Sequence, residues 1–287
     1  MEMARDFVER YKESETLPLF TSTCPASTKF LELFKPETLE HLSTVKSPAV
    51  LQGAILKHNL LKQKPETVKI VTVGTCTAHK MEITRDELVT DELPDVDASL
   101  TVRELGKMIK QKGIDYKRLK PLELDNTFTA TRPPVRGGAL TATINAVSEL
   151  LDHKPLEDIT FKRVFGDIES SGSIEEATVL IGGNKLLIAR VRGGVAFTEF
   201  FQRMSKKRYH IVELMMCPGG CVVGGGMPLV KNLTTHEVIQ RREDALCTGL
   251  DAPLSNPTHN TIVQSLPLAE LQEFVHTSYS QKEYTKG

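Results

Sequence analysis

The segment CPGGCVVGGG at residues 217–226 constrains this chain more than any other part of its sequence. Five of its residues are glycines, and glycine alone adopts positive φ angles freely and lets the backbone approach a neighbour without a Cβ in the way. Cys217 and Cys221 lie at the start of this run. The pattern predicts a loop that closes tightly around a bulky group held by the two thiols.

Three kinds of bound group compete for this loop. A phosphate-binding loop requires a Lys followed by Ser or Thr after its last glycine, and this chain has Met227 and Pro228 there. A structural zinc site favours two short Cys-x-x-Cys or Cys/His pairs, which the sequence lacks. Four soft thiolates, two isolated and two close together, suit an iron–sulfur cluster instead. The cysteines that could supply them are Cys24, Cys76, Cys217 and Cys221.

Cys247 is the fifth cysteine, and it lies within a predicted helix. A lone cysteine in such a place is most often a small buried hydrophobe, so Cys247 is not expected to join the site. A disulfide framework is also disfavoured. The first residues, MEMARDFVER, lack an apolar signal-peptide core, and disulfides rarely persist in the reducing compartment that this predicts.

Composition excludes several classes of partner. The 287 residues contain 36 Lys and Arg against 37 Asp and Glu, so no excess of positive charge is available for nucleic acid. No apolar run reaches the roughly 20 residues that cross a bilayer. The protein is therefore expected in the cytoplasm, with neither nucleic acid nor membrane as a partner. At about 150 residues per domain, the length predicts two domains or one large domain built as two lobes.

Helical and extended segments alternate, which predicts an α/β fold of two lobes with mostly parallel sheets flanked by helices. Apolar spacing and capping signals predict helices at residues 2–12, 28–42, 48–62, 101–112, 139–152 and 195–206, with more after Thr234, Pro257 and Pro267. β-Branched and apolar runs predict strands at residues 67–73, 96–100, 161–165, 177–181, 185–191 and 209–215, the first of them buried. Ligands lie at the carboxyl ends of parallel strands, and Cys76 and Cys217 each follow a predicted strand.

Three segments resemble the signature motifs of the [FeFe]-hydrogenase catalytic domain. They are TSTCP at residues 21–25, GTCTAHKME at 74–82 and ELMMCPGGCVVGGGMP at 213–228, in the family's order. Weaker likeness at residues 42–48, 96–110 and 276–279 extends the resemblance over nearly the whole chain. It implies one hydrogenase-like domain over residues 1–287. Its first lobe would run to about residue 135, its second over 136–230, and a helical tail over 231–287.

The resemblance also implies a cofactor between the two lobes. Cys24, Cys76, Cys217 and Cys221 would hold a [4Fe–4S] cluster, and Cys221 would bridge to a two-iron subcluster with CO, CN⁻ and a bridging dithiolate. Together these groups form the H-cluster. The further residues predicted to contact this cofactor are Gly74, Met215, Ser47 and Pro48.

Several positions depart from the family pattern where protons move and cyanide binds. Thr23 stands where the family's proton relay begins at a cysteine, and a Thr hydroxyl can orient a proton but does not titrate near neutral pH. The next relay positions are Ser43 and Asp6, the latter in place of a Glu. His79 replaces a Lys that donates to a cyanide, and Gly74 replaces a Met, which opens space. These departures predict slow turnover.

The resemblance implies an enzyme that oxidises H₂ or reduces protons, and slow turnover would also suit an H₂ sensor. Its partners would be H₂ and protons, a ferredoxin or another redox or signalling protein, and the maturation proteins that supply the cofactor.

Two non-catalytic alternatives stand beside it. One is an iron–sulfur protein of the hydrogenase-related type that serves cytosolic cluster assembly. Such relatives carry an additional N-terminal cysteine set, for which this chain has one cysteine to spare. The other, an α/β domain with inert cysteines, does not explain the glycine run. The resemblance begins after the family's first strand–helix unit. A compact version, a fragment and a chain completed by another subunit all fit that observation.

Overall fold

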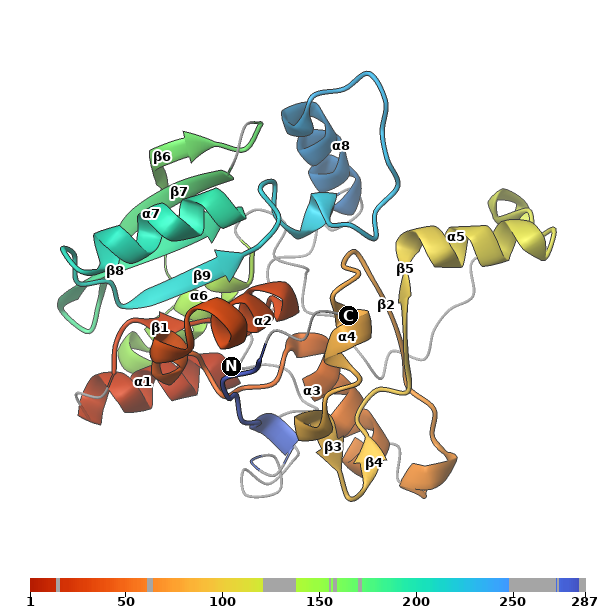
Figure 1. Ribbon diagram of the computed structural model, residues 1–287, viewed down its shortest axis with the longest axis horizontal. Coiled ribbons are helices and arrows are strands. Elements are labelled where there is room, and N and C mark those ends of the chain that lie inside the picture. Colours follow the sequence, from red (N-terminus) through yellow and green to blue (C-terminus); the bar gives the residue numbers. More distant parts are fainter. Residues whose placement is uncertain are drawn as a thin grey trace.

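The computed structural model describes residues 1–13, 16–60, 64–120, 138–154, 156, 159–169, 172–247, 272 and 274–283. Its helices are α1 (Glu2–Glu13), α2 (Pro25–Phe34), α3 (Pro48–Ile55), α4 (His79–Glu82), α5 (Val102–Gln111), α6 (Gly138–Asp152), α7 (Gly194–Met204) and α8 (Thr235–Cys247). Its strands are β1 (Leu19–Phe20), β2 (Val71–Gly74), β3 (Val89–Thr90), β4 (Leu93–Pro94), β5 (Ala98–Thr101), β6 (Lys162–Asp167), β7 (Gly172–Ile181), β8 (Asn184–Arg192) and β9 (Ile211–Met215). The chain is a mixed α/β protein with several sheets (Figure 1).

The largest sheet has five strands in the order β1-β9-β8-β7-β6. β1 and β8 run parallel to β9, whereas β7 pairs antiparallel with both β8 and β6. The prediction of mostly parallel sheets is therefore wrong for this sheet, which is mixed. The reason is the connection Gly182–Gly183, in which both residues have positive φ angles. A link of two residues between neighbouring strands permits only an antiparallel hairpin.

Both faces of the five-stranded sheet are covered by helices. On one face, Phe7 of α1 and Leu140 and Ile144 of α6 form a core with Ile188 and Ile211 of the sheet. On the other face, residues of α2 and α7 pack against the sheet in a second core, which contains Leu31, Phe197, Phe200, Tyr209 and Val212. The apolar face of α1 is therefore buried mainly against residues far from it in the sequence.

The remaining strands form two small sheets, a parallel pair β2–β5 and an antiparallel pair β3–β4. The prediction of a buried strand at 67–73 is wrong in extent and in burial. β2 begins at Val71, and Val71 and Val73 are 53% and 47% exposed. A parallel strand is buried only where further strands or helices cover it, and in the described chain β2 pairs with β5 alone.

Short sequence signals lie at several helix ends. Thr101 and Glu104 form a capping box at the start of α5, and Gly113 follows this helix with a φ of 64°. Pro48 is the first residue of α3. Thr234 accepts from the Glu237 N–H at the start of α8. The helices predicted after Pro257 and Pro267 lie outside the described residues. No described helix is both long and apolar enough to span a bilayer.

Candidate functional site

Loops after three strands and one tight turn position the four candidate thiols. Cys24 caps α2, between β1 and Pro25, the first residue of the helix. Cys76 lies two residues after β2, Cys217 lies two residues after β9, and Cys221 begins a 3-10 turn. Because β1 and β9 are parallel neighbours, Cys24 and Cys217 leave the large sheet at the same edge. The elements thus carry all four cysteines towards one region.

The thiols are close enough to oppose one another's ionisation. Burial raises the pKa of Cys76, and the nearby Cys24 raises it further. Burial also raises the pKa of Cys217, as do Cys24 and Cys76. Cys221 is the most exposed of the four as a residue, yet burial of its thiol and the charges of its neighbours raise its pKa to about 12. A group that binds these sulfurs as thiolates must therefore bring positive charge with it.

Gly224 and Gly226 allow the loop with Cys221 to lie directly against the loop after β2. A Cβ added to Gly224 would lie 2.5 Å from the Thr75 carbonyl oxygen. A Cβ on Gly226 would lie 2.8 Å from the Thr101 side chain, and the Gly226 N–H donates to the Thr75 carbonyl at 2.8 Å. The close neighbour that these glycines require is thus the backbone beside Cys76, so they help to hold the thiols together.

The arrangement fits a cluster of several irons better than a single ion. Within the described residues, no three His, Cys, Asp or Glu side chains converge as the ligands of one metal ion do. A structural zinc ion needs four ligands about 2–2.3 Å from one centre. An iron–sulfur cluster is instead held by one thiolate at each of several irons, and thiols carried on the loops after β1, β2 and β9 suit it.

Three of the residues predicted to contact the cofactor are Ser47, Pro48 and Met215. Ser47 precedes Pro48 at the start of α3, and its buried hydroxyl has no hydrogen-bond partner in the described chain. Such an orphaned group is available to a bound molecule. Met215 is 8% exposed, and its sulfur lies 3.8 Å from the position of a Cβ on Gly220, between Cys217 and Cys221.

Gly74 and His79 lie beside one another. A Cβ on Gly74 would meet only the His79 ring, at 3.9 Å, so the space at this position is open. His79 Nδ1 lies 2.7 Å from an oxygen of the buried Glu82, which fixes the orientation of the ring. Glu82 was not singled out in the sequence, although its i, i+3 spacing from His79 on one helix indicates such a contact.

The predicted relay residues form two separate groups. Ser43 donates to Asp6 at 2.5 Å, and Arg10 donates to the other oxygen of the same carboxylate at 2.7 Å. Thr23 lies 3.4 Å from Thr21, hydroxyl to hydroxyl. No hydrogen bond in the described chain connects Thr23 to Ser43. Arg10 was missed in the sequence, although it follows Asp6 by one helical turn.

Glu213 is a further residue that the sequence reasoning missed as a neighbour of the thiols. It lies in β9, is 2% exposed and accepts from the Leu140 N–H at 3.3 Å. Burial raises its pKa, which the charges of Arg190 and Arg192 oppose. Its carboxylate in turn raises the pKa of Cys221. The sequence could have indicated Glu213, which is a single acid within an otherwise apolar strand. A charge buried in this way needs a specific partner.

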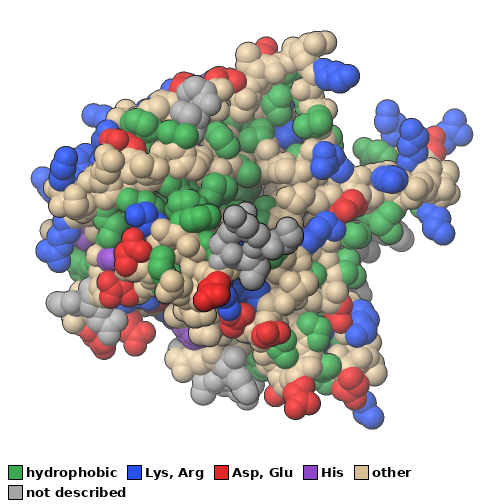
Figure 2. Space-filling view, viewed as in Figure 1, with side chains coloured by type: hydrophobic (Ala, Val, Ile, Leu, Met, Phe, Trp, Pro, Cys, Tyr) green, Lys and Arg blue, Asp and Glu red, His purple; other side chains and the backbone are tan. Residues whose placement is uncertain are grey.

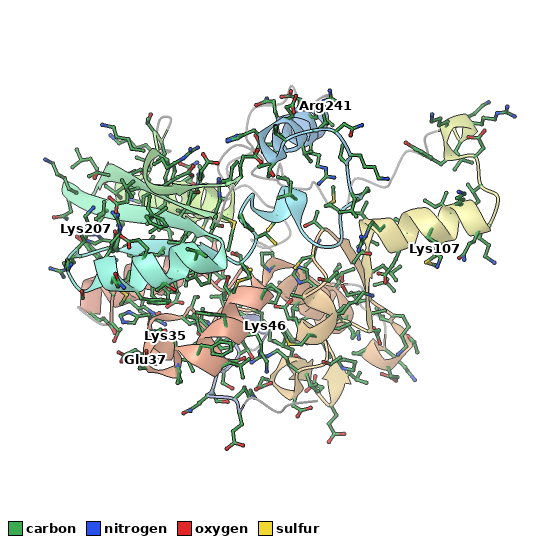
Figure 3. The ribbon with its side chains drawn as sticks, turned by 45° about the horizontal axis from the view of Figure 1, so that its top comes forward. Lys35, Glu37, Lys46, Lys107, Lys207 and Arg241 are labelled. Atoms are coloured by element: carbon green, nitrogen blue, oxygen red, sulfur yellow. The ribbon has the colours of Figure 1, made fainter. Side chains whose placement is uncertain are left out.

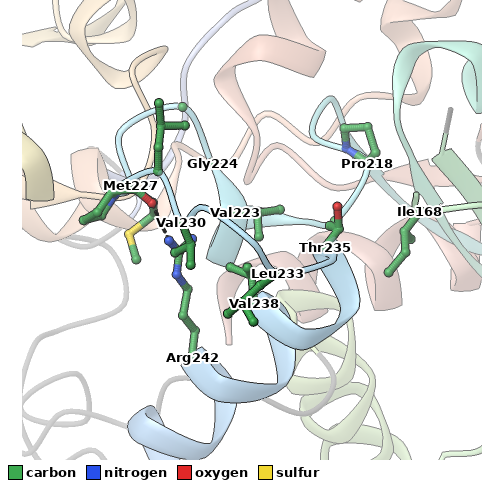
Figure 4. Close-up of a pocket in the computed structure, with 14 residues that line it drawn as sticks. Ile168, Pro218, Val223, Gly224, Met227, Val230, Leu233, Thr235, Val238 and Arg242 are labelled. Carbon is green, nitrogen blue, oxygen red and sulfur yellow. Dashed lines mark hydrogen bonds between the residues drawn. The ribbon is translucent and has the colours of Figure 1, made fainter. Parts of the chain in front are cut away.

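A pocket of about 360 Å³ lies behind the cysteine loop (Figure 4). Its lining includes Pro218, Val223 and Val238 but none of the four cysteines. Arg242 of α8 crosses this region and donates to the carbonyls of Val222, at 2.6 Å, and Pro228, at 2.5 Å. The helix thereby holds the glycine-rich loop at both ends of its glycine run.

Comparison with known proteins identifies the family to which this chain belongs. The family described as "Iron only hydrogenase large subunit, C-terminal domain" matches residues 1–225. The chain belongs to this hydrogenase family. The hydrogenase domain is 36% identical to the periplasmic [Fe] hydrogenase large subunit of Nitratidesulfovibrio vulgaris, across 90% of this chain and 63% of that one. It is also 36% identical to iron hydrogenase 1 of Clostridium pasteurianum, across 86% and 44%. It therefore spans less than two thirds of either relative.

Two other comparisons add to this placement. Cytosolic iron-sulfur assembly component 3 of Bos taurus is 27% identical over 97% of this chain and 63% of its own. A solved structure described as showing stepwise [FeFe]-hydrogenase H-cluster assembly in HydA(deltaEFG) superposes with a TM-score of 0.84. Their sequences are 26% identical, and the match covers 98% of this chain and 81% of that one. The hydrogenase domain thus has both catalytic and assembly-type relatives.

Proposed function

We propose that this hydrogenase domain interconverts H₂ with protons and electrons, and does so slowly. The observation that supports this most directly is that the loop with Cys217 and Cys221 packs on the loop with Cys76, while Cys24 and Cys217 leave the same edge of the large sheet. Cys24, Cys76, Cys217 and Cys221 would hold a [4Fe–4S] cluster, and Cys221 would also carry a two-iron subcluster with CO, CN⁻ and a bridging dithiolate. When bound, this cofactor supplies the cleavage of H₂ and the path for electrons.

The chain's own residues would bind the cofactor and move protons to it. Met215 and the unpartnered hydroxyl of Ser47 would contact the cofactor and help to exclude water. Ser43 and Asp6 would carry a proton between the surface and the interior. Thr23 has no group that titrates near neutral pH, which supports an interrupted relay and therefore slow turnover.

Infrared spectroscopy tests the proposal directly. The protein is purified without oxygen, loaded with iron and sulfide, and matured with a two-iron complex that carries CO and CN⁻. We expect CO and CN⁻ stretching bands that stay with the protein through gel filtration, together with slow H₂ production from a reduced dye. Iron–sulfur absorbance without retained bands would contradict the catalytic proposal.

A second candidate is a non-catalytic iron–sulfur protein related to the assembly component. The non-titrating Thr23 and the 27% identity to the Bos taurus protein favour it. It predicts a stable [4Fe–4S] signal but neither retained infrared bands nor H₂ turnover, so the same experiment separates the two candidates. A sensory role, a cytoplasmic location, and a ferredoxin-like or signalling partner belong to the catalytic proposal.

A further inference from the structure

α5 stands out from the body of the molecule as an arm (Figure 1). None of its residues is buried. Leu105, Met108 and Ile109 share one face of the helix, and Met108 is 48% exposed. Just beyond it, Tyr116 and Leu119 are 67% and 63% exposed. A lone helix of ten residues is marginal in water, so an apolar face this exposed indicates a partner that covers it.

The arm is strongly basic, although the whole chain carries a formal net charge of −1. Residues 102–120 contain seven Lys or Arg against two acids, Glu104 and Asp115. Both acids already have partners within the chain. Glu104 lies 3.0 Å from Lys80, and Asp115 lies 3.1 Å from Arg118. The charge that remains on the arm is therefore almost entirely positive.

Arg103, Lys107 and Lys110 form a stripe along one face of α5, because they are spaced by four and three residues. None of the three forms an ion pair with an acidic side chain of the described chain. Figure 2 shows Lys and Arg side chains gathered around this arm, and Figure 3 shows Lys107 on the projecting helix. The stripe faces solvent and offers its charge to a second molecule.

The base of the arm lies against the thiol site. The Arg103 N–H donates to the Gly226 carbonyl at 3.2 Å, within the loop that carries Cys221. β2, which pairs with the strand before α5, ends two residues before Cys76. Its exposed Val71 and Val73 lie on one face of the strand. An apolar patch and a basic stripe therefore flank the loops from which electrons would leave.

We propose that α5 and the exposed face of β2 form the docking surface for a small acidic redox protein with an apolar patch. The inference rests on the proposed function, because the partner would exchange single electrons with the [4Fe–4S] cluster. Such an interface combines an apolar centre with a charged rim. Opposite charge speeds the encounter, and an encounter of this kind weakens as salt rises. One electron passes from the reduced partner to the oxidised cluster, and no bond forms or breaks.

An anionic membrane is the other surface that a basic amphipathic helix could bind. The position of the arm favours a protein. Its base contacts the cysteine-bearing loop, and the exposed Val71 and Val73 lie on a strand that leads to Cys76. A lipid surface would leave the cluster without a partner with which to exchange electrons.

The experiment measures electron transfer and binding separately. Reduced plant-type ferredoxin, a small acidic redox protein, is mixed in stopped flow with the protein carrying only its oxidised [4Fe–4S] cluster. Anisotropy of labelled ferredoxin gives the affinity, with and without that cluster. In about 0.02 M salt, Lys107→Glu with Lys110→Glu should lower the rate and the affinity about tenfold or more, and in about 0.2 M salt the difference should shrink. Val71→Thr with Val73→Thr should lower the affinity at both concentrations.

The matched control is Lys162→Glu with Lys185→Glu, which makes the same charge change on exposed residues of β6 and β8, away from the arm. This variant should keep wild-type rate and affinity. Equal effects of the two charge reversals would overturn the proposal, because net charge alone would then explain binding. So would a wild-type rate in the Lys107→Glu, Lys110→Glu variant, or anionic vesicles bound by the wild type in place of ferredoxin.

The two proposals fail differently. If no [4Fe–4S] absorbance develops, the proposed function is wrong, while the anisotropy series still decides whether the arm binds an acidic protein. If the cluster forms and infrared bands are retained but the arm variant binds ferredoxin like the wild type, the docking surface is wrong and the hydrogenase proposal stands.

Discussion

Single residues decide whether the cofactor can bind, because the protein alone disfavours the thiolates that metals require. Burial and mutual repulsion raise the pKa of Cys76, Cys217 and Cys221. Replacing Cys76 by Ser, or Cys24 or Cys217 likewise, should abolish the iron–sulfur absorbance after reconstitution, since each removes one ligand. Cys247→Ser is the control and should keep it. A cluster that survives Cys76→Ser but not Cys247→Ser would refute the proposed ligand set.

Thr23 provides the second residue-level prediction. Its hydroxyl contacts Thr21 at 3.4 Å, while Ser43 and Asp6 are already joined at 2.5 Å. Thr23→Cys places a titratable thiol beside Cys24, and proton transfer by a positioned group is worth about 10²–10⁴-fold. We expect H₂ production to rise at least about tenfold in the matured protein. Thr23→Ser, which adds no titratable group, should stay at the wild-type rate. Equal rates in all three proteins, with equal infrared bands, would show that proton supply does not limit turnover.

At the scale of elements, the glycine-rich loop depends on backbone contact. A Cβ at Gly224 would lie 2.5 Å from the Thr75 carbonyl oxygen, so Gly224→Ala must push the loop away from Cys76. We expect a loss of about 1–3 kcal/mol in the free energy of unfolding and a lower iron content. Gly106→Ala is the contrasting variant, because no atom lies within 4 Å of that Cβ in α5. It should gain about 0.5–1 kcal/mol. Urea titrations of both variants check this, and similar stabilities would refute it.

Asp97, just before β5, accepts hydrogen bonds from residues just before β2 and from Lys57, which lies in the helical turn after α3. Burial on its own raises the pKa of Asp97, yet hydrogen bonds from Lys57, the Ile70 N–H and Lys69 lower it to about 2. Because this pKa is lower in the folded chain than in the unfolded one, the stabilisation is present above about pH 4 and is lost as pH falls towards 2. Asp97→Asn should therefore be less stable at pH 7 and lose less on acidification. If the urea midpoints of both proteins fall by the same amount between these pH values, the assignment is wrong.

The elements also show what a sequence can predict. The capping box at Thr101 and Glu104 and the hairpin turn at Gly182 are signals within a few residues, and both are found in the structure. The pairing of β1 with β9 is not such a signal, because it joins segments far apart in the chain. Nor could the run around Val71 reveal its exposure, since β-branched residues favour a strand whether or not another element covers it.

In the candidate site, too, local properties can be predicted from the sequence and long-range contacts cannot. Residue types and the glycine run are enough to select four cysteines out of five, because thiol chemistry and backbone freedom are properties of the residues themselves. The contacts of Arg10 with Asp6 and of Glu82 with His79 lie within single helices, and their spacing of four and three residues indicates them in the sequence. Partners from distant segments were not accessible in this way. The raised pKa of Cys221 depends on Glu213, which only the fold brings near it.

For the whole molecule, a bound cluster would join the loop after β2 to the edge of the five-stranded sheet. A ligand that binds only the folded chain raises its stability. Reconstitution with iron and sulfide should therefore raise the Tm, by about 2 °C for each kcal/mol gained in a chain of this size. Amide exchange should slow at residues 21–24, 74–78 and 217–226. The same treatment of Cys76→Ser should change neither measurement, and a Tm rise in that variant would point to binding elsewhere.

Because β1 pairs with β9, the large sheet can be completed only late in translation. Leu19 leaves the ribosome roughly 190 residues before its partner Ile211, and at about 5–20 residues per second this delay is on the order of 10–40 s. Throughout that interval, α1 and β1 present Phe7 and Phe20 without the sheet that buries them. Cys24 likewise waits for Cys217. A group held by both Cys24 and Cys217 could therefore be inserted only after residue 217 has been synthesised.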